Sequence, residues 1–90
     1  MITHLEATDI TARSLRVVWR SDTSEDVRVL LRLGTEIVRG PISVPTVGRP
    51  DPMSARQLLF EDLEPGMTYE IVVEGSGPGR THTVTTRRSP

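Results

Sequence analysis

Short stretches in which apolar and polar side chains alternate dominate this chain and limit what it can fold into. In the segment 14–20, Leu15, Val17 and Trp19 fall on one side of an extended backbone. The segments 27–33 and 69–74 alternate in the same way. Because a strand with one apolar and one polar side belongs to a sheet with one buried face, the pattern predicts antiparallel sheets that face water on the other side.

Four further segments complete the set of expected strands. They are 5–10, 36–39 after a turn at Gly34-Thr35, 57–60, and the Thr-rich 81–86. The segment 53–63 also has apolar residues near helical spacing, but prolines lie on both sides of it, so we expect a strand there. The Pro-rich residues 40–52 fit an edge strand or a loop. Together the segments predict an all-β fold, a seven-stranded antiparallel β-sandwich.

The chain is short enough for one domain, since domains run from about 50 to 250 residues. We expect a single domain over 1–90, with a core of about 5–86 and residues 87–90 at the start of a linker. Only Trp19, Phe60 and Tyr69 are aromatic, so Val, Leu and Ile must supply most of the core.

The stretch from Leu63 to Tyr69 carries the most specific local signal. Pro65 presets φ and Gly66 allows a positive φ, so we expect a tight corner between the two sheets, with Leu63 entering the core before it. The stretch resembles the signature of the fibronectin type III family, in which Leu and Pro-Gly precede a Tyr that opens a strand. The resemblance implies a tyrosine corner, in which the Tyr69 hydroxyl bonds to the backbone a few residues upstream.

Trp19 extends the resemblance, because the family carries a core Trp in a segment similar to 14–19, about fifty residues before the corner Tyr. The resemblance covers the chain from Leu5 to Thr86 and implies an immunoglobulin-like sandwich. The structural core that it implies includes Trp19, Leu63, Pro65, Gly66 and Tyr69.

The chain departs from the family at several positions. Met67 stands where Thr is usual, and Val27 or Val29 stands where the strand usually begins with an aromatic residue. The turn at 75–79 is short and has no Arg-Gly-Asp, so the familiar integrin-binding loop is absent. Modules of this family occur in matrix proteins, in receptor ectodomains and as spacers in bacterial polysaccharide-degrading enzymes.

Charge and composition exclude several classes of partner. The net charge is −1, from 11 basic and 12 acidic residues, and so gives no basic footprint for nucleic acid or for an anionic membrane. All basic residues are Arg, and there is no Cys to form disulfides or thiolate metal sites. No apolar run approaches the roughly 20 residues that span a bilayer, and the amino terminus has no signal-peptide pattern.

The sequence also gives no catalytic, metal or cofactor motif. There is no Gly-x-Ser-x-Gly elbow, and His4 and His82 alone make no ligand set. The acidic clusters 22–26 and 61–64 lack an alternating calcium-loop pattern, and the Gly-rich turn 75–79 precedes a strand rather than a helix. We therefore expect no enzyme activity, no metal and no cofactor.

One face offers a candidate for protein binding. Leu30 is expected to point outward between Arg28 and Arg32, and Val72 between Glu70 and Glu74 on the neighbouring strand. Arg–Glu pairs across the strands explain these acids better than a glycosidase pair does. An exposed apolar centre with a charged rim fits a protein–protein contact, although an ordinary sheet face is the alternative. Val18 and Leu59 are expected outward on the other sheet.

These observations predict a non-catalytic protein-interaction or spacer module of a larger, extracellular multidomain protein, with the parent's signal peptide outside this sequence. The module is expected to be monomeric and to contact protein partners or neighbouring domains of its own chain. Two alternatives stay open. One is an accessory module of a secreted carbohydrate-active enzyme, and the other is an engineered binding scaffold.

Overall fold

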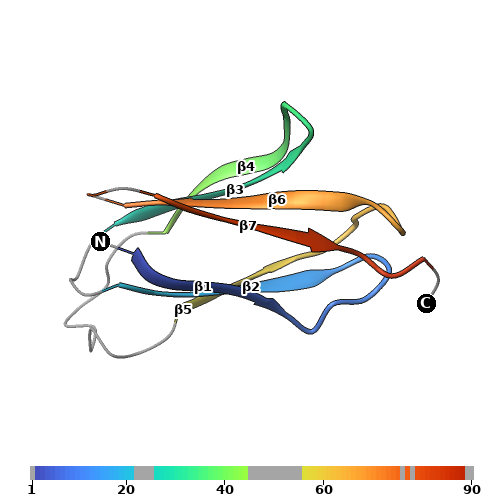
Figure 1. Cartoon of the computed structure of the whole chain (residues 1–90), viewed down its shortest axis with the longest axis horizontal. Coiled ribbons are helices and arrows are strands. Elements are labelled where there is room, and N and C mark those ends of the chain that lie inside the picture. The colour runs from blue at the N-terminus through green and yellow to red at the C-terminus, as the bar shows by residue number, and fades with distance from the viewer. Residues whose placement is uncertain (1, 22–25, 45–55, 76, 78, 89–90) are drawn as a thin grey trace.

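The computed structural model describes residues 2–21, 26–44, 56–75, 77 and 79–88, which form seven β-strands (Figure 1). In chain order the strands are β1 (Ile2–Thr8), β2 (Leu15–Ser21), β3 (Val27–Leu33), β4 (Glu36–Val44), β5 (Arg56–Phe60), β6 (Thr68–Glu74) and β7 (Arg80–Thr85). None of the described residues lies in a helix, so no helix among them could span a membrane. The predicted all-β fold is confirmed.

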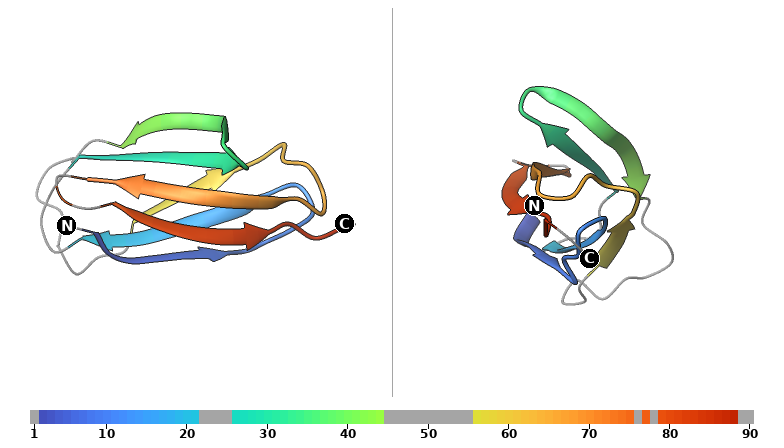
Figure 2. Two further views of the ribbon diagram at one scale, coloured as in Figure 1. Left: turned by 45° about the horizontal axis from the view of Figure 1, so that its top comes forward. Right: turned by 90° about the vertical axis from the view of Figure 1, so that its right-hand side faces the viewer.

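The strands form two antiparallel sheets that pack face to face (Figure 2). One sheet has the order β1-β2-β5 and the other has the order β4-β3-β6-β7. The molecule measures 40 × 24 × 18 Å, and its strands run along the longest axis (Figure 1). The fold is therefore an elongated β-sandwich.

The inward side chains of both sheets meet in one hydrophobic core. Trp19 and its strand neighbours Leu15 and Val17 are completely buried, as the alternation in 14–20 predicts. Phe60 and Tyr69 keep only 3% of their surface exposed, so all three aromatic rings lie inside. The core consists of Ile2, Leu15, Val17, Trp19, Val27, Val29, Leu31, Phe60, Leu63, Tyr69, Ile71, Val73 and Val84.

Two strands are longer than expected. β1 begins at Ile2 rather than at Leu5 and ends at Thr8 rather than at Ile10. Ile2 is buried in the core, so the core starts three residues earlier than predicted. β4 continues to Val44, which makes the first part of the Pro-rich segment an edge strand rather than a loop. Residues 56–60 form strand β5, so the strand interpretation of that region is confirmed over the helical one.

Strand β4 follows β3 with two irregularities in its register. Leu31 pairs with Arg39 and Arg32 pairs with Ile37, so residues of β4 are skipped on each side of Arg39. The backbone comes close to β3 at Gly40, where a Cβ atom would lie 2.7 Å from the carbonyl oxygen of Val29 and where φ is +81°. Only glycine tolerates both conditions, and simple alternation between faces is lost along this strand.

The corner between β5 and β6 has the geometry expected of a tyrosine corner. The Tyr69 hydroxyl accepts a hydrogen bond of 3.0 Å from the backbone N–H of Glu64, and Leu63 is buried. Gly66 adopts a φ of +67°, as a tight turn requires. The assignment of Pro65 and Gly66 to the core is wrong, because Pro65 is half-buried and Gly66 is exposed. They shape the corner, whereas Leu63 and Tyr69 fill the interior.

Arginine side chains connect the two sheets at both of their long edges. Arg80 of β7 donates from Nε to the carbonyl oxygen of Ile2, the first residue of β1, over 2.8 Å. At the opposite edge, Arg39 of β4 donates from Nη2 to the carbonyl oxygen of Asp62, beyond β5, over 2.6 Å. A guanidinium has several fixed donors and can bond to a carbonyl while its stem packs along the sandwich.

The end of the described chain is also held in the domain. The backbone N–H of Arg87 donates to the carbonyl oxygen of Thr11 over 3.1 Å, and the carbonyl oxygen of Arg87 accepts from Gly66 N over 2.9 Å. The expected linker therefore does not begin at Arg87. Residues 89–90 of that expected linker lie outside the described residues.

Candidate functional site

The six residues of the predicted binding face come together on β3 and β6. Arg28 pairs with Glu74, Leu30 with Val72, and Arg32 with Glu70 in an unbroken antiparallel register. We call these six outward residues of the β4-β3-β6-β7 sheet the four-stranded face. The sequence alternation placed every one of them on the correct side of its strand.

The four-stranded face does not have the exposed apolar centre that was predicted. Leu30 is only 6% exposed, and Val72 is half-buried. β3 is an inner strand of its sheet, with β4 on one side and β6 on the other, and long side chains precede and follow Leu30. Alternation predicts the side on which a residue lies, but neighbours on both sides decide how much of it water reaches. The prediction of an exposed Leu30 patch is wrong.

Two of the charged side chains at the rim of this face pair with each other. Arg32 Nη2 forms an ion pair with Glu70 Oε1, and the two side chains are 38% and 35% exposed. Such half-exposed pairs contribute about 0–1 kcal/mol to stability. The cross-strand pairing expected of Arg32 and Glu70 is therefore present.

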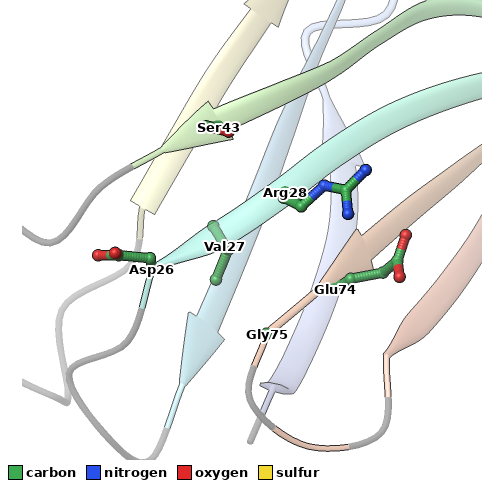
Figure 3. Close-up of a pocket in the computed structure, with 6 residues that line it drawn as sticks. All are labelled: Asp26, Val27, Arg28, Ser43, Glu74 and Gly75. Carbon is green, nitrogen blue, oxygen red and sulfur yellow. The ribbon is translucent and has the colours of Figure 1, made fainter.

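A hollow of about 320 Å³ lies where β3 begins and β6 ends (Figure 3). Its lining consists of Asp26, Val27, Arg28, Ser43, Glu74 and Gly75. In Figure 3, Arg28 and Glu74 extend to the same side while Asp26 extends the other way, so the charged groups do not converge on one point. Specific ligand sites combine apolar walls with convergent polar groups, and this lining offers little of either.

The outward side of the other sheet presents a different surface. The outward residues of β2 and β5, which we call the three-stranded face, are Arg16, Val18, Arg20, Gln57 and Leu59. Leu59 is 46% exposed and lies opposite Arg16, and Val18 is half-buried. Arg16 Nη1 reaches Asp9 Oδ2 over 3.1 Å. Leu59 is thus outward and exposed, as the sequence predicts for this sheet, whereas Leu30 on the other face is not exposed.

Two exposed apolar residues on β4 were missed by the sequence reasoning. Ile37 is 48% exposed and Ile42 is 37% exposed. Ile42 pairs with the buried Val29, so regular alternation would place it inward. The cluster of Gly40 and Pro41 was the available signal, because such residues interrupt a strand's regular register.

The histidines of the described residues do not come together in a metal-binding set. His4 lies on β1 with its Nε2 atom 3.4 Å from Glu6 Oε1, and His82 lies on β7. No group of three His, Cys, Asp or Glu side chains within the described ranges could hold a metal ion. Parts of the 22–26 acidic cluster and of the 75–79 turn fall outside those ranges.

Comparisons with known proteins find similarity in structure but not in sequence. No protein-family model matches the chain, and no curated protein matches it. A computationally redesigned β-sandwich protein is 21% identical over 96% of this chain and 93% of its own, with a TM-score of 0.70.

The sensor domain of the anti-sigma factor RsgI4 in Pseudobacteroides cellulosolvens is similar in two structures. One is 17% identical with a TM-score of 0.67, and the comparison covers 97% of this chain and 93% of that one. The other is 16% identical with a TM-score of 0.68, and the comparison covers 97% and 74% of the respective chains. At such identities the likeness concerns the fold, so the chain shares the β-sandwich architecture of these proteins.

Proposed function

We propose that this chain is a non-catalytic spacer module of the fibronectin type III type within a larger extracellular multidomain protein. The observation that carries the proposal is the position of the two chain ends. β1 begins at one end of the 40 Å long axis, and β7 finishes at the other (Figure 1). A module that the polypeptide enters at one pole and leaves at the other separates its neighbours by its full length.

The corner supports the fibronectin type III part of this proposal. The bond from Glu64 N to the Tyr69 hydroxyl, the buried Leu63 before it and the positive φ of Gly66 are what the resemblance implies for that stretch. The fully buried Trp19 on β2 agrees with the role that the family gives to its core Trp.

The spacer role is favoured over recognition through the four-stranded face. That face has a buried Leu30 and a half-buried Val72, with Arg32 and Glu70 joined in an ion pair. Protein-binding hot spots need large side chains that a partner can cover, and Leu30 offers almost no accessible surface. Its surroundings resemble an ordinary solvated sheet face more than a binding patch.

Small-angle X-ray scattering of three copies joined in series tests the spacer role. The expected result is an extended particle whose maximum dimension grows by about 40 Å with each added copy, the length of the long axis. A matched series with flexible Gly-Ser linkers between copies serves as the control, since such linkers behave as random coils. A particle in which the copies fold back against one another would sink the proposal.

Binding through another surface is the second candidate function. Ile37 and Ile42 on β4 and Leu59 on β5 are more exposed than the other large hydrophobic residues described, with Met67 next. β4 and β5 lie at the same edge of the sandwich, where Arg39 of β4 donates to the carbonyl oxygen of Asp62, two residues after β5. Capture experiments on matrix and cell-surface extracts, with Ile37→Glu and Leu59→Glu as matched variants, would favour this role only if capture were specific and lost in a variant.

Direct sugar binding has less support, although an accessory module of a carbohydrate-active enzyme was one alternative. Binding of polysaccharides commonly relies on exposed aromatic rings, which present a flat apolar body. The chain has three such rings, and all of them are buried. Retention of the isolated domain on an insoluble polysaccharide would show that it binds sugar without exposed aromatic rings.

A further inference from the structure

The residues that follow β7 are fixed to two distant segments at the carboxyl-terminal pole of the sandwich. Thr86 N donates to Met67 O over 3.0 Å, and Arg87 N donates to Thr11 O over 3.1 Å. The carbonyl oxygen of Arg87 accepts from Gly66 N over 2.9 Å. The backbone at Arg87 is therefore bonded through both its donor and its acceptor, as in a central strand.

Side chains strengthen the same attachment. Thr86 is only 2% exposed; its hydroxyl donates to Glu64 O over 2.7 Å and accepts from Met67 N over 3.1 Å. Arg87 donates from Nε to Ile10 O over 3.0 Å. Arg88 packs against Gly66, where an added Cβ would lie 3.3 Å from Arg88 Cγ. Side chains from three consecutive residues thus contact the pole.

The segments that receive these bonds are themselves well anchored. The Thr11 hydroxyl accepts hydrogen bonds from Arg13 N and Ser14 N, over 3.2 and 3.0 Å, which close the turn after β1. Arg13 O accepts from Leu63 N over 2.9 Å, and Leu63 is buried in the core. A polypeptide tied to such segments cannot swing without breaking bonds that connect to the core.

We propose that residues 86–88 form a rigid exit, which fixes the direction in which the polypeptide leaves the sandwich. The module would then set the angle of the domain that follows it as well as the distance to it. The orienting of a following domain rests on the proposed spacer function. The rigidity of residues 86–88 rests only on the contacts described above.

Amide hydrogen exchange and nitrogen-15 relaxation of the single domain test the rigidity. The Arg87 and Thr86 amides are expected to be as ordered and as protected as those of β6. Thr86→Val and Arg87→Ala are expected to speed exchange at Arg87 by about tenfold or more, because a free-energy change of about 1.4 kcal/mol is tenfold in an equilibrium constant. Thr83→Val, at an exposed position of β7, is the matched control and is expected to leave that exchange unchanged. An Arg87 amide that exchanges like a free chain in the unaltered protein would overturn the rigid exit.

A direct fusion of two copies tests the consequence. Residues 89, 90 and 1 alone would join Arg88 of one copy to Ile2 of the next. Because the chain has no Cys, Thr83→Cys in each copy places one nitroxide label per domain. Pulsed electron paramagnetic resonance is expected to give one narrow distance distribution, which Arg87→Ala broadens at least twofold and Thr81→Ala does not.

The outcomes separate the two proposals. An extended pair with a broad distribution of label distances contradicts the rigid exit but is compatible with the spacer function. A compact pair, with the domains folded back on each other, contradicts the spacer function. The hydrogen exchange of the Arg87 amide is then the sole test of the rigid exit.

Discussion

The two outward faces of the sandwich carry similar side chains, but the leucine of one face is buried and the leucine of the other is exposed. On the four-stranded face, Leu30 lies between two arginines and is 6% exposed. On the three-stranded face, Leu59 lies opposite Arg16 and is 46% exposed. β3 has a neighbouring strand on each side, whereas β5 pairs only with β2 in its sheet. The place of a strand in its sheet, more than its own sequence, decides whether an outward leucine becomes part of the packed structure.

This difference changes what each face can do. Leu30 contributes to stability and has little surface left for a partner. Leu59 contributes little to stability, and its side chain is available for contact.

Introducing a charge at each leucine separates the faces most strongly. Leu30→Glu is expected to lower the free energy of unfolding by about 3 kcal/mol, because the packed leucine is lost and a carboxylate at this 6% exposed position gives up most of its hydration, even beside two arginines. Leu59→Glu is expected to change it by less than about 0.5 kcal/mol, as surface substitutions do. Urea unfolding followed by circular dichroism measures both values. Equal losses in the two variants would mean that the faces do not differ as described.

Truncation gives a smaller contrast without adding charge. Leu30→Ala is expected to cost about 2–3 kcal/mol, from lost apolar burial and the space left behind. Leu59→Ala is expected to cost less than about 1 kcal/mol, since roughly half of the side chain is already in water. Calorimetric unfolding of the two variants and the parent checks this pair. A Leu30→Ala variant as stable as the parent would show that its neighbours do not pack on it.

The smallest expected difference between the two faces is in the coupling energies of their ion pairs. Arg32 and Glu70 are 38% and 35% exposed, whereas Arg16 and Asp9 are 39% and 64% exposed. Double-mutant cycles are expected to give a coupling energy of about 0.5–1 kcal/mol for the first pair and about 0.2–0.5 kcal/mol for the second. Both couplings are expected to shrink in about 1 M salt, where charges are screened within about 3 Å. A stronger coupling for Arg16 and Asp9 would contradict the conclusion that the four-stranded face is the more enclosed of the two.

Much of the fold could be predicted because its strands obey simple alternation. Leu15, Val17 and Trp19 are inward on β2, and the sides of Arg28 and Glu74 followed from the same period of two. The corner at Tyr69 was also predictable, since its geometry depends on a few consecutive residues whose backbone preferences are strong.

The parts that could not be predicted depend on contacts between strands far apart in the sequence. Leu30 is buried on an inner strand between β4 and β6, where it pairs with Val72, and Ile42 is exposed on a strand whose register is irregular. The hydrogen bond from Arg80 to Ile2 joins residues near opposite ends of the sequence, and no local sequence pattern predicts it. Such features arise only when the sheets are assembled.

The burial of Trp19 has a spectroscopic consequence. It is the only tryptophan, it is completely buried, and its indole Nε1 has no hydrogen-bond partner among the described residues. Indole emission moves to longer wavelength when the ring meets water, so the native protein is expected to fluoresce at short wavelength and to shift to the red on unfolding. Trp19 pairs with Leu5 on β1 and with Arg56 on β5, so this single intrinsic fluorophore reports on all three strands of its sheet.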